Sequence, residues 1–93
     1  MWWVYLCRCA DDSLYAGVAV DVGWRIQTHN IGKYGAKYTR SRRPVVFAYA
    51  EGPYTQGDAL RRERIIKTMS RANKLKLIEQ SGIKPTEAEN APS

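Results

Sequence analysis

The sequence predicts an α+β domain whose elements follow in the order strand, strand, helix, strand, helix, helix. Residues 3–9 and 14–19 alternate as strands do, and an Asp-Asp-Ser turn separates them. In the C-terminal half, two helical stretches each follow a residue suited to cap a helix, Thr55 and Ser70. The chain has 93 residues, the size of a single core, so we expect one domain.

The first two strands should pair as an antiparallel hairpin because only a short turn joins them. In the first strand, the odd-numbered residues from Trp3 to Cys9 fall on one face. Gly17, in the second strand, indicates either a β-bulge or room for another group to approach the backbone. Cys7 and Cys9 are badly placed to bridge each other, so we expect two buried thiols in a reducing compartment and no structural zinc site.

A helix should follow the hairpin over residues 22–30, because Asp21 is a suitable N-cap and Gly32 a suitable stop. Arg25 and His29 are four residues apart and therefore share one face of this helix. The residues that can pack the helix are Val22, Trp24 and Ile26.

Residues 32–43 contain two glycines and no apolar periodicity, which predicts a loop. Its basic and aromatic side chains would suit a phosphate backbone and unstacked bases. A solvated basic loop without function is the alternative. The candidate DNA-binding residues are Lys33, Lys37, Tyr38, Arg40, Arg42 and Arg43.

An apolar run over residues 45–50 predicts a third, central strand that ends at Gly52-Pro53. The helix after it should run from Gln56 to about Met69. At helical spacing, Glu63 falls within the apolar side of that helix. A carboxylate there is costly unless a cation or a metal meets it, so Glu63 is either a metal ligand or the partner of a neighbouring arginine. The apolar side comprises Ala59, Leu60 and Ile66, and the arginines are Arg61, Arg62 and Arg64.

The predicted domain covers residues 1–79, with a last helix over residues 71–79 that packs through its leucines and isoleucine. Asn73, three residues after the cap, most simply belongs to the start of that helix. Residues 80–93 hold two prolines and little to bury, so we expect a disordered tail.

Charge points to a polyanionic partner, because 15 Lys and Arg against 9 Asp and Glu give a net charge of +6. Nucleic acid is the leading candidate, since each neutralised phosphate releases counterions. No basic leader with an apolar run and no membrane-length apolar stretch occurs, so we expect a cytoplasmic protein that does not enter a membrane.

Five chemically active side chains stand in otherwise packed elements. A carboxylate can hold Mg²⁺ or Mn²⁺, a guanidinium can stabilise a phosphorane-like transition state, and a phenol or an imidazole can take a proton from water. This set suits phosphodiester hydrolysis. Its members are Tyr5, Tyr15, Arg25, His29 and Glu63.

At these residues the sequence resembles the GIY-YIG endonucleases, and in particular their small stand-alone bacterial branch. Trp3-Val4-Tyr5 resembles the first half of the motif, with Trp in place of Gly, and Tyr15-Ala16-Gly17 resembles the second. Arg25 and His29 stand where the family has its helix Arg and its His or Tyr. The segments GAKYTRSRRPV and ALRRERIIKTMSRANKL resemble the same branch, the second carrying Glu63 at the metal-binding position.

The resemblance implies a three-stranded antiparallel sheet flanked by helices, and a DNA endonuclease that uses a single Mg²⁺ or Mn²⁺ ion. Because the sequence predicts no second domain to confer sequence specificity, we expect little sequence preference. It implies Tyr5 as general base or water-positioning group with help from Tyr15 and His29, Arg25 on the scissile phosphate, and Glu63 as the metal ligand. These side chains should then converge on one cleft.

Two other functions stay open. The chain could be a nucleic-acid-binding module that keeps the fold and cuts nothing, or the tyrosines could be core residues only. The oligomeric state, the strandedness of the DNA and the role of Asn73 are also open.

Overall fold

The sheet has three antiparallel strands, as expected, and their order is β2-β1-β3. The computed structural model describes residues 1–31 and 37–81. The central strand β1 (Trp2–Arg8) pairs on one side with β2 (Leu14–Ala19), with Tyr5 opposite Gly17. On its other side β1 pairs with β3 (Val46–Tyr54), with two register shifts along the ladder.

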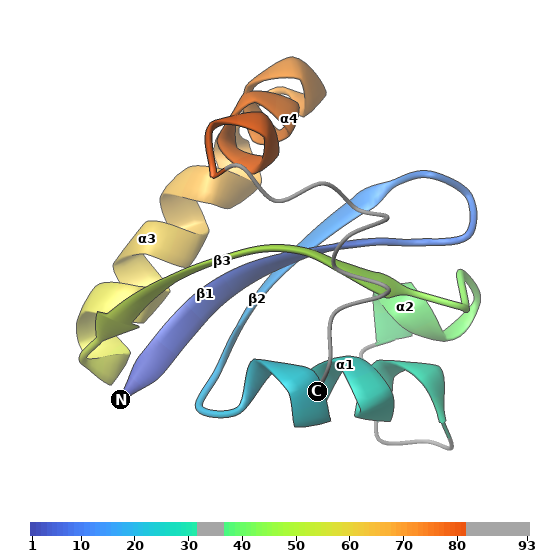
Figure 1. Cartoon of the computed structure of the whole chain (residues 1–93), viewed down its shortest axis with the longest axis horizontal. Coiled ribbons are helices and arrows are strands. Elements are labelled where there is room, and N and C mark those ends of the chain that lie inside the picture. The colour runs from blue at the N-terminus through green and yellow to red at the C-terminus, as the bar shows by residue number, and fades with distance from the viewer. Residues whose placement is uncertain (32–36, 82–93) are drawn as a thin grey trace.

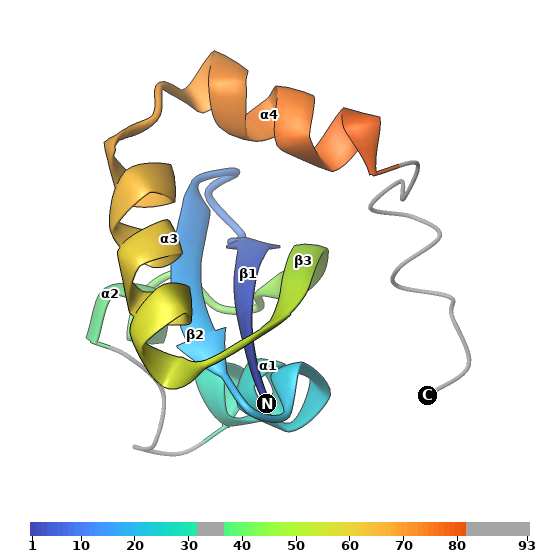
Figure 2. The ribbon, with the colours of Figure 1, turned by 90° about the vertical axis from the view of Figure 1, so that its left-hand side faces the viewer.

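Helices cover both faces of the sheet (Figures 1 and 2). The helix α1 (Val22–Asn30) lies on one face, and α3 (Gln56–Thr68) and α4 (Arg71–Gln80) lie on the other. A single helical turn, α2 (Lys37–Arg40), lies near α1. The α+β class and the element order predicted from the sequence are therefore confirmed, apart from the added α2.

Alternation along β1 divides the core in two, as a pleated strand with two covered faces requires. Val4 and Leu6 pack with Ala59 and Ile66 of α3 in one cluster. Tyr5 and Cys7 belong to a second cluster, against which the α1 side chains pack. Both cysteines are free and buried, as expected.

The three predicted N-caps are present. Asp21 Oδ1 accepts from Trp24 N at 2.9 Å, and Thr55 Oγ1 accepts from Asp58 N at 3.2 Å. Ser70 Oγ accepts from the backbone N–H of Asn73 at 3.2 Å, so Asn73 belongs to the start of α4. Each cap satisfies one of the backbone donors that a helix start leaves unpaired.

The third strand differs from the prediction in position and length. It is an edge strand, and it continues through Gly52-Pro53 to Tyr54. Its run of apolar residues reflects cover on both faces by the helix layers, which an edge strand can have as readily as a central one. Proline is tolerated there because an edge strand leaves one side of its backbone without a partner strand.

Two predicted packing residues are exposed. Trp24 is 62% exposed on α1 and Leu60 is 41% exposed on α3. Each helix contacts the core along a narrow stripe, and these side chains lie beside it. The predicted loop also contains α2, which carries no apolar periodicity to reveal it.

The last helix, α4, ends one residue later than predicted. Gln80 closes α4 instead of starting a tail, and Ser81 caps the helix. The rest of the predicted tail, residues 82–93, and the predicted stop at Gly32 lie outside the described residues. Among the helices of residues 1–31 and 37–81, none has the length and apolar character needed to cross a membrane.

Candidate active site

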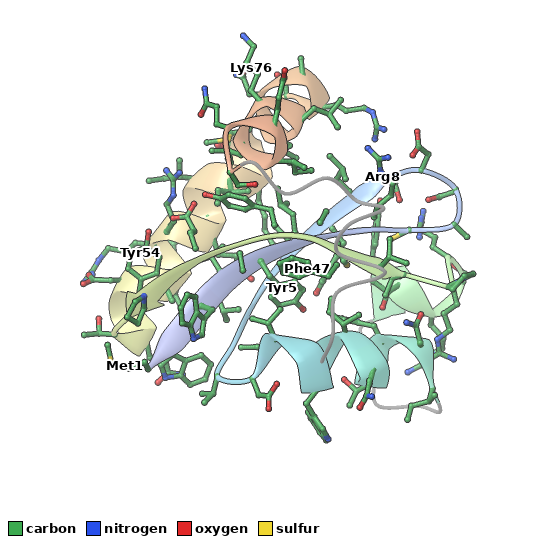
Figure 3. The ribbon with its side chains drawn as sticks, in the orientation of Figure 1. Met1, Tyr5, Arg8, Phe47, Tyr54 and Lys76 are labelled. Carbon is green, nitrogen blue, oxygen red and sulfur yellow. The ribbon has the colours of Figure 1, made fainter. Side chains whose placement is uncertain are left out.

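A buried chain of hydrogen bonds joins β1, α1 and α2. Tyr5 points from the sheet toward α1 (Figure 3), and its Oη lies 2.7 Å from His29 Nε2. The other ring nitrogen, His29 Nδ1, lies 2.8 Å from Thr39 Oγ1. Tyr5 is 1% exposed, and His29 and Thr39 are fully buried. Every polar atom in this chain therefore depends on its neighbours for a partner.

The Tyr5 phenol holds its proton firmly. Burial raises its pKa, and the neighbouring Tyr15 and Cys7 raise it further, while a hydrogen bond and the positive charge of Arg25 act in the opposite direction. Arg25 itself is partly buried, and its Nη1 also donates to Thr28 Oγ1 at 3.3 Å. Arg25 therefore joins α1 to the Tyr5 oxygen from the side opposite the imidazole chain.

Gly17 gives the Tyr5 ring the space it occupies. A Cβ built at Gly17 would stand 2.5 Å from Tyr5 Oη and 2.6 Å from Cζ. The register of β1 and β2 is unbroken at this position, so the glycine serves close approach and not a bulge. The pairing of Gly17 with Tyr5 places the phenol directly across the ladder.

Tyr15 lies over the buried chain and is only partly buried. Its ring centroid is 5.2 Å from that of His29 in an edge arrangement and 6.5 Å from that of Tyr5. Its other neighbour is Tyr38, stacked at 5.6 Å, and the guanidinium of Arg42 lies 4.0 Å from the Tyr38 centroid. In the described part of the chain, the Tyr15 hydroxyl has no hydrogen-bond partner.

Glu63 approaches the same region from the other layer. Burial raises the pKa of Tyr15, the positive charge of Arg25 lowers it, and the negative charge of Glu63 raises it. Tyr15 belongs to the edge strand β2, against which α3 packs, so the charge of Glu63 acts on Tyr15 although α3 covers the face opposite α1.

The predicted convergence therefore has two parts. Tyr5, Tyr15, Arg25 and His29 meet on the α1 face, and Glu63 joins them electrostatically at the β2 edge. No pocket encloses these groups within residues 1–31 and 37–81, and Tyr5 and His29 are buried, so the described residues do not form the expected single cleft.

Arg42 and Arg43 of the predicted basic loop make contacts within the protein. Arg42 Nε pairs with Asp11 Oδ2 at 3.0 Å, and Arg43 Nε donates to the carbonyl oxygen of His29 at 2.6 Å. Tyr38 and Arg40 are exposed. Lys33 and the side chain of Lys37 lie outside the described residues.

Comparison with known proteins identifies the family. The model of the GIY-YIG catalytic domain matches residues 1–76. The chain belongs to the GIY-YIG family. This GIY-YIG chain is 54% identical over 78 residues to a UPF0213 protein of Staphylococcus haemolyticus, covering 84% of this chain and 94% of that one.

Other relatives agree. A UPF0213 protein of Syntrophus aciditrophicus is 51% identical over 79 residues, covering 85% of this chain and 91% of its own. The solution NMR structure of a UPF0213 protein from Bacillus halodurans superposes with a TM-score of 0.60 at 37% identity, covering 100% of this chain and 98% of that one. The resemblance and the fold inferred from the motif residues are thus confirmed.

In this GIY-YIG domain, Glu63 is a partly buried carboxylate of α3. Its side chain is 18% exposed on the helix face beside the buried Ala59 and Ile66. Its ion-pair partner is Lys67, with Nζ 3.7 Å from Oε2, a long contact made by a half-exposed lysine. The alternative interpretation, an ion pair of Glu63 with Arg61, Arg62 or Arg64, is wrong for the described residues, because Arg61 pairs with Asp58, Arg62 pairs with Glu51, and Glu63 pairs with Lys67.

The donor set limits which metal fits. Among the described residues, no group of three His, Cys, Asp or Glu side chains could hold an ion. One carboxylate suits Mg²⁺ or Mn²⁺, which are bound through few protein ligands and keep several waters. It does not suit structural zinc, which takes four protein ligands.

Two contacts of this GIY-YIG domain had no signal in the sequence. Thr39 stands in the basic loop without periodicity, and its contact with His29 joins residues ten positions apart. Asn30 fixes α1 to the start of β3 by donating to Val45 O at 2.8 Å and accepting from Val45 N at 2.7 Å. Sequence periodicity indicates which residues share a face of one helix or strand. Both of these contacts join residues of different elements, so periodicity could not predict them.

His29 should make the stability of the domain pH-dependent. Burial lowers its pKa from 6.5 to about 4, and the charges of Arg25 and Arg43 act in the same direction. In this window the unfolded chain binds a proton that the folded chain does not, so the contribution is complete above pH 6.5 and is lost as pH falls toward 4. We expect a total loss of about 3 kcal/mol from this group.

Chemical denaturation of wild type and His29→Gln at intervals from pH 7 to pH 5 measures this, since ordinary carboxylates stay ionised over this interval. The variant should be less stable at pH 7 and should lose less stability on acidification. Equal slopes for the two proteins would show that His29 is not the titrating group.

Proposed function

We propose that this protein is a metal-dependent endonuclease that hydrolyses DNA phosphodiester bonds. The observation that carries the proposal is the Tyr5 phenol held between Arg25 and the neutral His29 ring, with 2.7 Å between Tyr5 Oη and His29 Nε2. A phosphate-binding cation and a proton acceptor thus share one phenol. Membership of the GIY-YIG family supports the same reaction class.

Tyr5 takes the proton of the attacking water. Tyr5 is protonated at neutral pH, so it would accept this proton while passing its own to His29 Nε2, and the water oxygen forms the bond to phosphorus. The pKa of His29, about 4 without substrate, must rise for this transfer, and the negative charge of a bound phosphate would raise it. The bond from phosphorus to the leaving oxygen breaks, and that oxygen is protonated from solvent. Tyr5 suits this role better than Tyr15 because its hydroxyl is hydrogen-bonded to a base, the His29 ring.

Arg25 and Tyr15 orient the substrate. The Arg25 guanidinium, one hydrogen bond from Tyr5, would bind the scissile phosphate and the charge that develops on it. The charges of Arg25 and Glu63 both act on the Tyr15 hydroxyl, which would position the water. Arg25 on α1 and Tyr15 on the edge strand β2 are both partly exposed, as contact with a long polymer requires.

Glu63 would hold Mg²⁺ or Mn²⁺ through its carboxylate. The ion, when bound, supplies Lewis-acid activation of the phosphate and stabilises the leaving oxygen. The effect of the Glu63 charge on the pKa of Tyr15 supports this assignment, because it couples the carboxylate to the other candidate side chains.

We propose that the substrate is DNA and that the protein recognises little of its sequence. The protein would act in DNA repair, processing or uptake. Exposed Arg40 and Tyr38 would contact backbone and unstacked bases, which carry little sequence information. The positive charges of Arg42 and Arg43 would add to the electrostatic attraction for DNA, and their internal contacts hold the segment in place. Lys33 and Lys37 would extend the basic surface. The reduced, buried cysteines fit a cytoplasmic location.

Cleavage assays test the proposal. Wild type with Mg²⁺ or Mn²⁺ should cut at least one of single-stranded, double-stranded and branched DNA, and Tyr5→Phe should lower the rate by about 10² or more, as loss of a general base does. The matched control is Tyr54→Phe, which removes a hydroxyl bonded to Glu51 and not to this site.

Equal rates for the two phenylalanine variants would remove Tyr5 from the chemistry. If wild type binds DNA in a salt-dependent manner but yields no products with either metal, the protein is a binding module.

A further inference from the structure

The buried threonine of α2 has a partner that the nuclease chemistry uses. Thr39 is fully buried, and its Oγ1 lies 2.8 Å from Nδ1 of His29. Two hydrogen bonds from Arg42 hold the segment that carries it, since Arg42 N donates to Thr39 O at 3.0 Å and Arg42 Nη1 donates to Tyr38 O at 2.8 Å. A hydroxyl fixed in this way against a buried imidazole can determine which ring nitrogen carries the proton.

The donors along the chain give the hydrogen bonds one direction. A guanidinium only donates, so the hydrogen bond from Arg25 makes the Tyr5 oxygen an acceptor. Burial keeps the phenol protonated at neutral pH, and its proton needs an acceptor of its own. That acceptor is His29 Nε2 at 2.7 Å, so Nε2 carries no hydrogen.

The neutral imidazole has a single N–H, which must then be on Nδ1. Thr39 Oγ1 lies at the right distance to accept it. The bonds thus run from Arg25 to Tyr5, from Tyr5 to His29, and from His29 to Thr39.

We propose that Thr39 is a positioning residue that holds His29 in the Nδ1–H tautomer, leaving Nε2 free to accept the proton of Tyr5. The hydroxyl also remains as acceptor when His29 takes that proton and becomes a cation. Thr39 touches no reacting atom, and its effect passes through His29 alone. The tautomer is a property of the folded protein; only its catalytic consequence rests on the proposed nuclease function.

The tautomer is measured directly by ¹⁵N NMR of the imidazole at pH 7, and His29 is the only histidine, so its signals need no separate assignment. Wild type should show a protonated Nδ1 and an unprotonated Nε2. Thr39→Val, which keeps the side-chain volume but offers no acceptor, should shift protonation toward Nε2. Thr39→Ser, which keeps the hydroxyl, should retain the wild-type pattern.

The change in kcat should parallel the change in the His29 tautomer. Thr39→Val should lower kcat by about 10-fold to 100-fold, the effect of one lost hydrogen bond at a buried polar group, with KM nearly unchanged. Thr39→Ser should recover most of kcat. A role in packing alone predicts the reverse order, because serine loses a buried methyl group and valine does not.

The two readouts separate the two proposals. A wild-type spectrum with the proton on Nε2, or an unchanged tautomer in folded Thr39→Val, overturns the role of Thr39 whether or not DNA is cut. If Thr39→Val does not fold, the wild-type spectrum and that of Thr39→Ser still decide, since both must show Nδ1–H. The predicted tautomers without any cleavage by wild type would support Thr39 and refute the nuclease.

Discussion

Glu63→Gln is expected to abolish metal-dependent cleavage, lowering the rate by about 10² to 10³, the usual effect of removing one preorganised catalytic group. Glutamine keeps the size and polarity of the side chain but loses the charge that binds a hard cation. The fold should persist, because the ion pair that Glu63 makes is the long, half-exposed contact with Lys67. Cleavage rates at several Mg²⁺ concentrations, with Mn²⁺ binding measured separately, test this.

The matched control for Glu63 is Glu79→Gln, the same change at an exposed position of α4. It changes the net charge equally but should leave both metal binding and cleavage unaltered. The assignment of Glu63 fails if its glutamine variant binds Mn²⁺ and cuts DNA as the control does. A loss of cleavage with undiminished Mn²⁺ binding would place Glu63 in the chemistry but not at the metal.

Gly17→Ala is expected to destabilise the domain by about 1–3 kcal/mol, the cost of overpacking a filled core. The new Cβ would stand 2.5 Å from Tyr5 Oη, a distance that forces the ring to move. The ring cannot move freely, because Tyr5 is 1% exposed and its hydroxyl is bonded to His29. Displacing the phenol should break that bond, so cleavage should fall with stability.

Gly23→Ala is the control for this prediction. A Cβ there meets nothing nearer than Asp21 Oδ1 at 3.6 Å, an ordinary contact. In the helix α1, alanine should leave the domain equally stable or up to about 1 kcal/mol more stable. Denaturant unfolding of both variants measures the contrast. If the two variants match wild type in stability, the close packing of Gly17 on Tyr5 has no energetic consequence.

Several parts of the structure are local enough to be predicted. The hairpin, the helix starts at Asp21, Thr55 and Ser70, and the shared face of Arg25 and His29 depend on residues a few positions apart. A strand repeats every two residues and a helix about every 3.6, so these periods appear directly in the sequence. The motif residues then extended the prediction to the family and the sheet.

Other features depend on which element covers which, and no local pattern carries them. Trp24 and Leu60 have helical spacing suited to packing, yet both are exposed because each helix meets the sheet along a narrow stripe. The strand β3 lies at an edge of the sheet, but it has the composition of a central strand because helices cover both of its faces. The amino-acid composition of a strand indicates how well its faces are covered and does not indicate its position in the sheet.

The candidate site divides in the same way. The sequence by itself determined the family and the sheet and supplied the five candidate active residues, because residue type, order and spacing are local properties. Only the tertiary structure decided that Gly17 makes room for Tyr5, that Thr39 completes the His29 chain, and that the charge of Glu63 acts on Tyr15. These interactions join residues 10 to 48 positions apart, a separation that only the packing of one element on another can close.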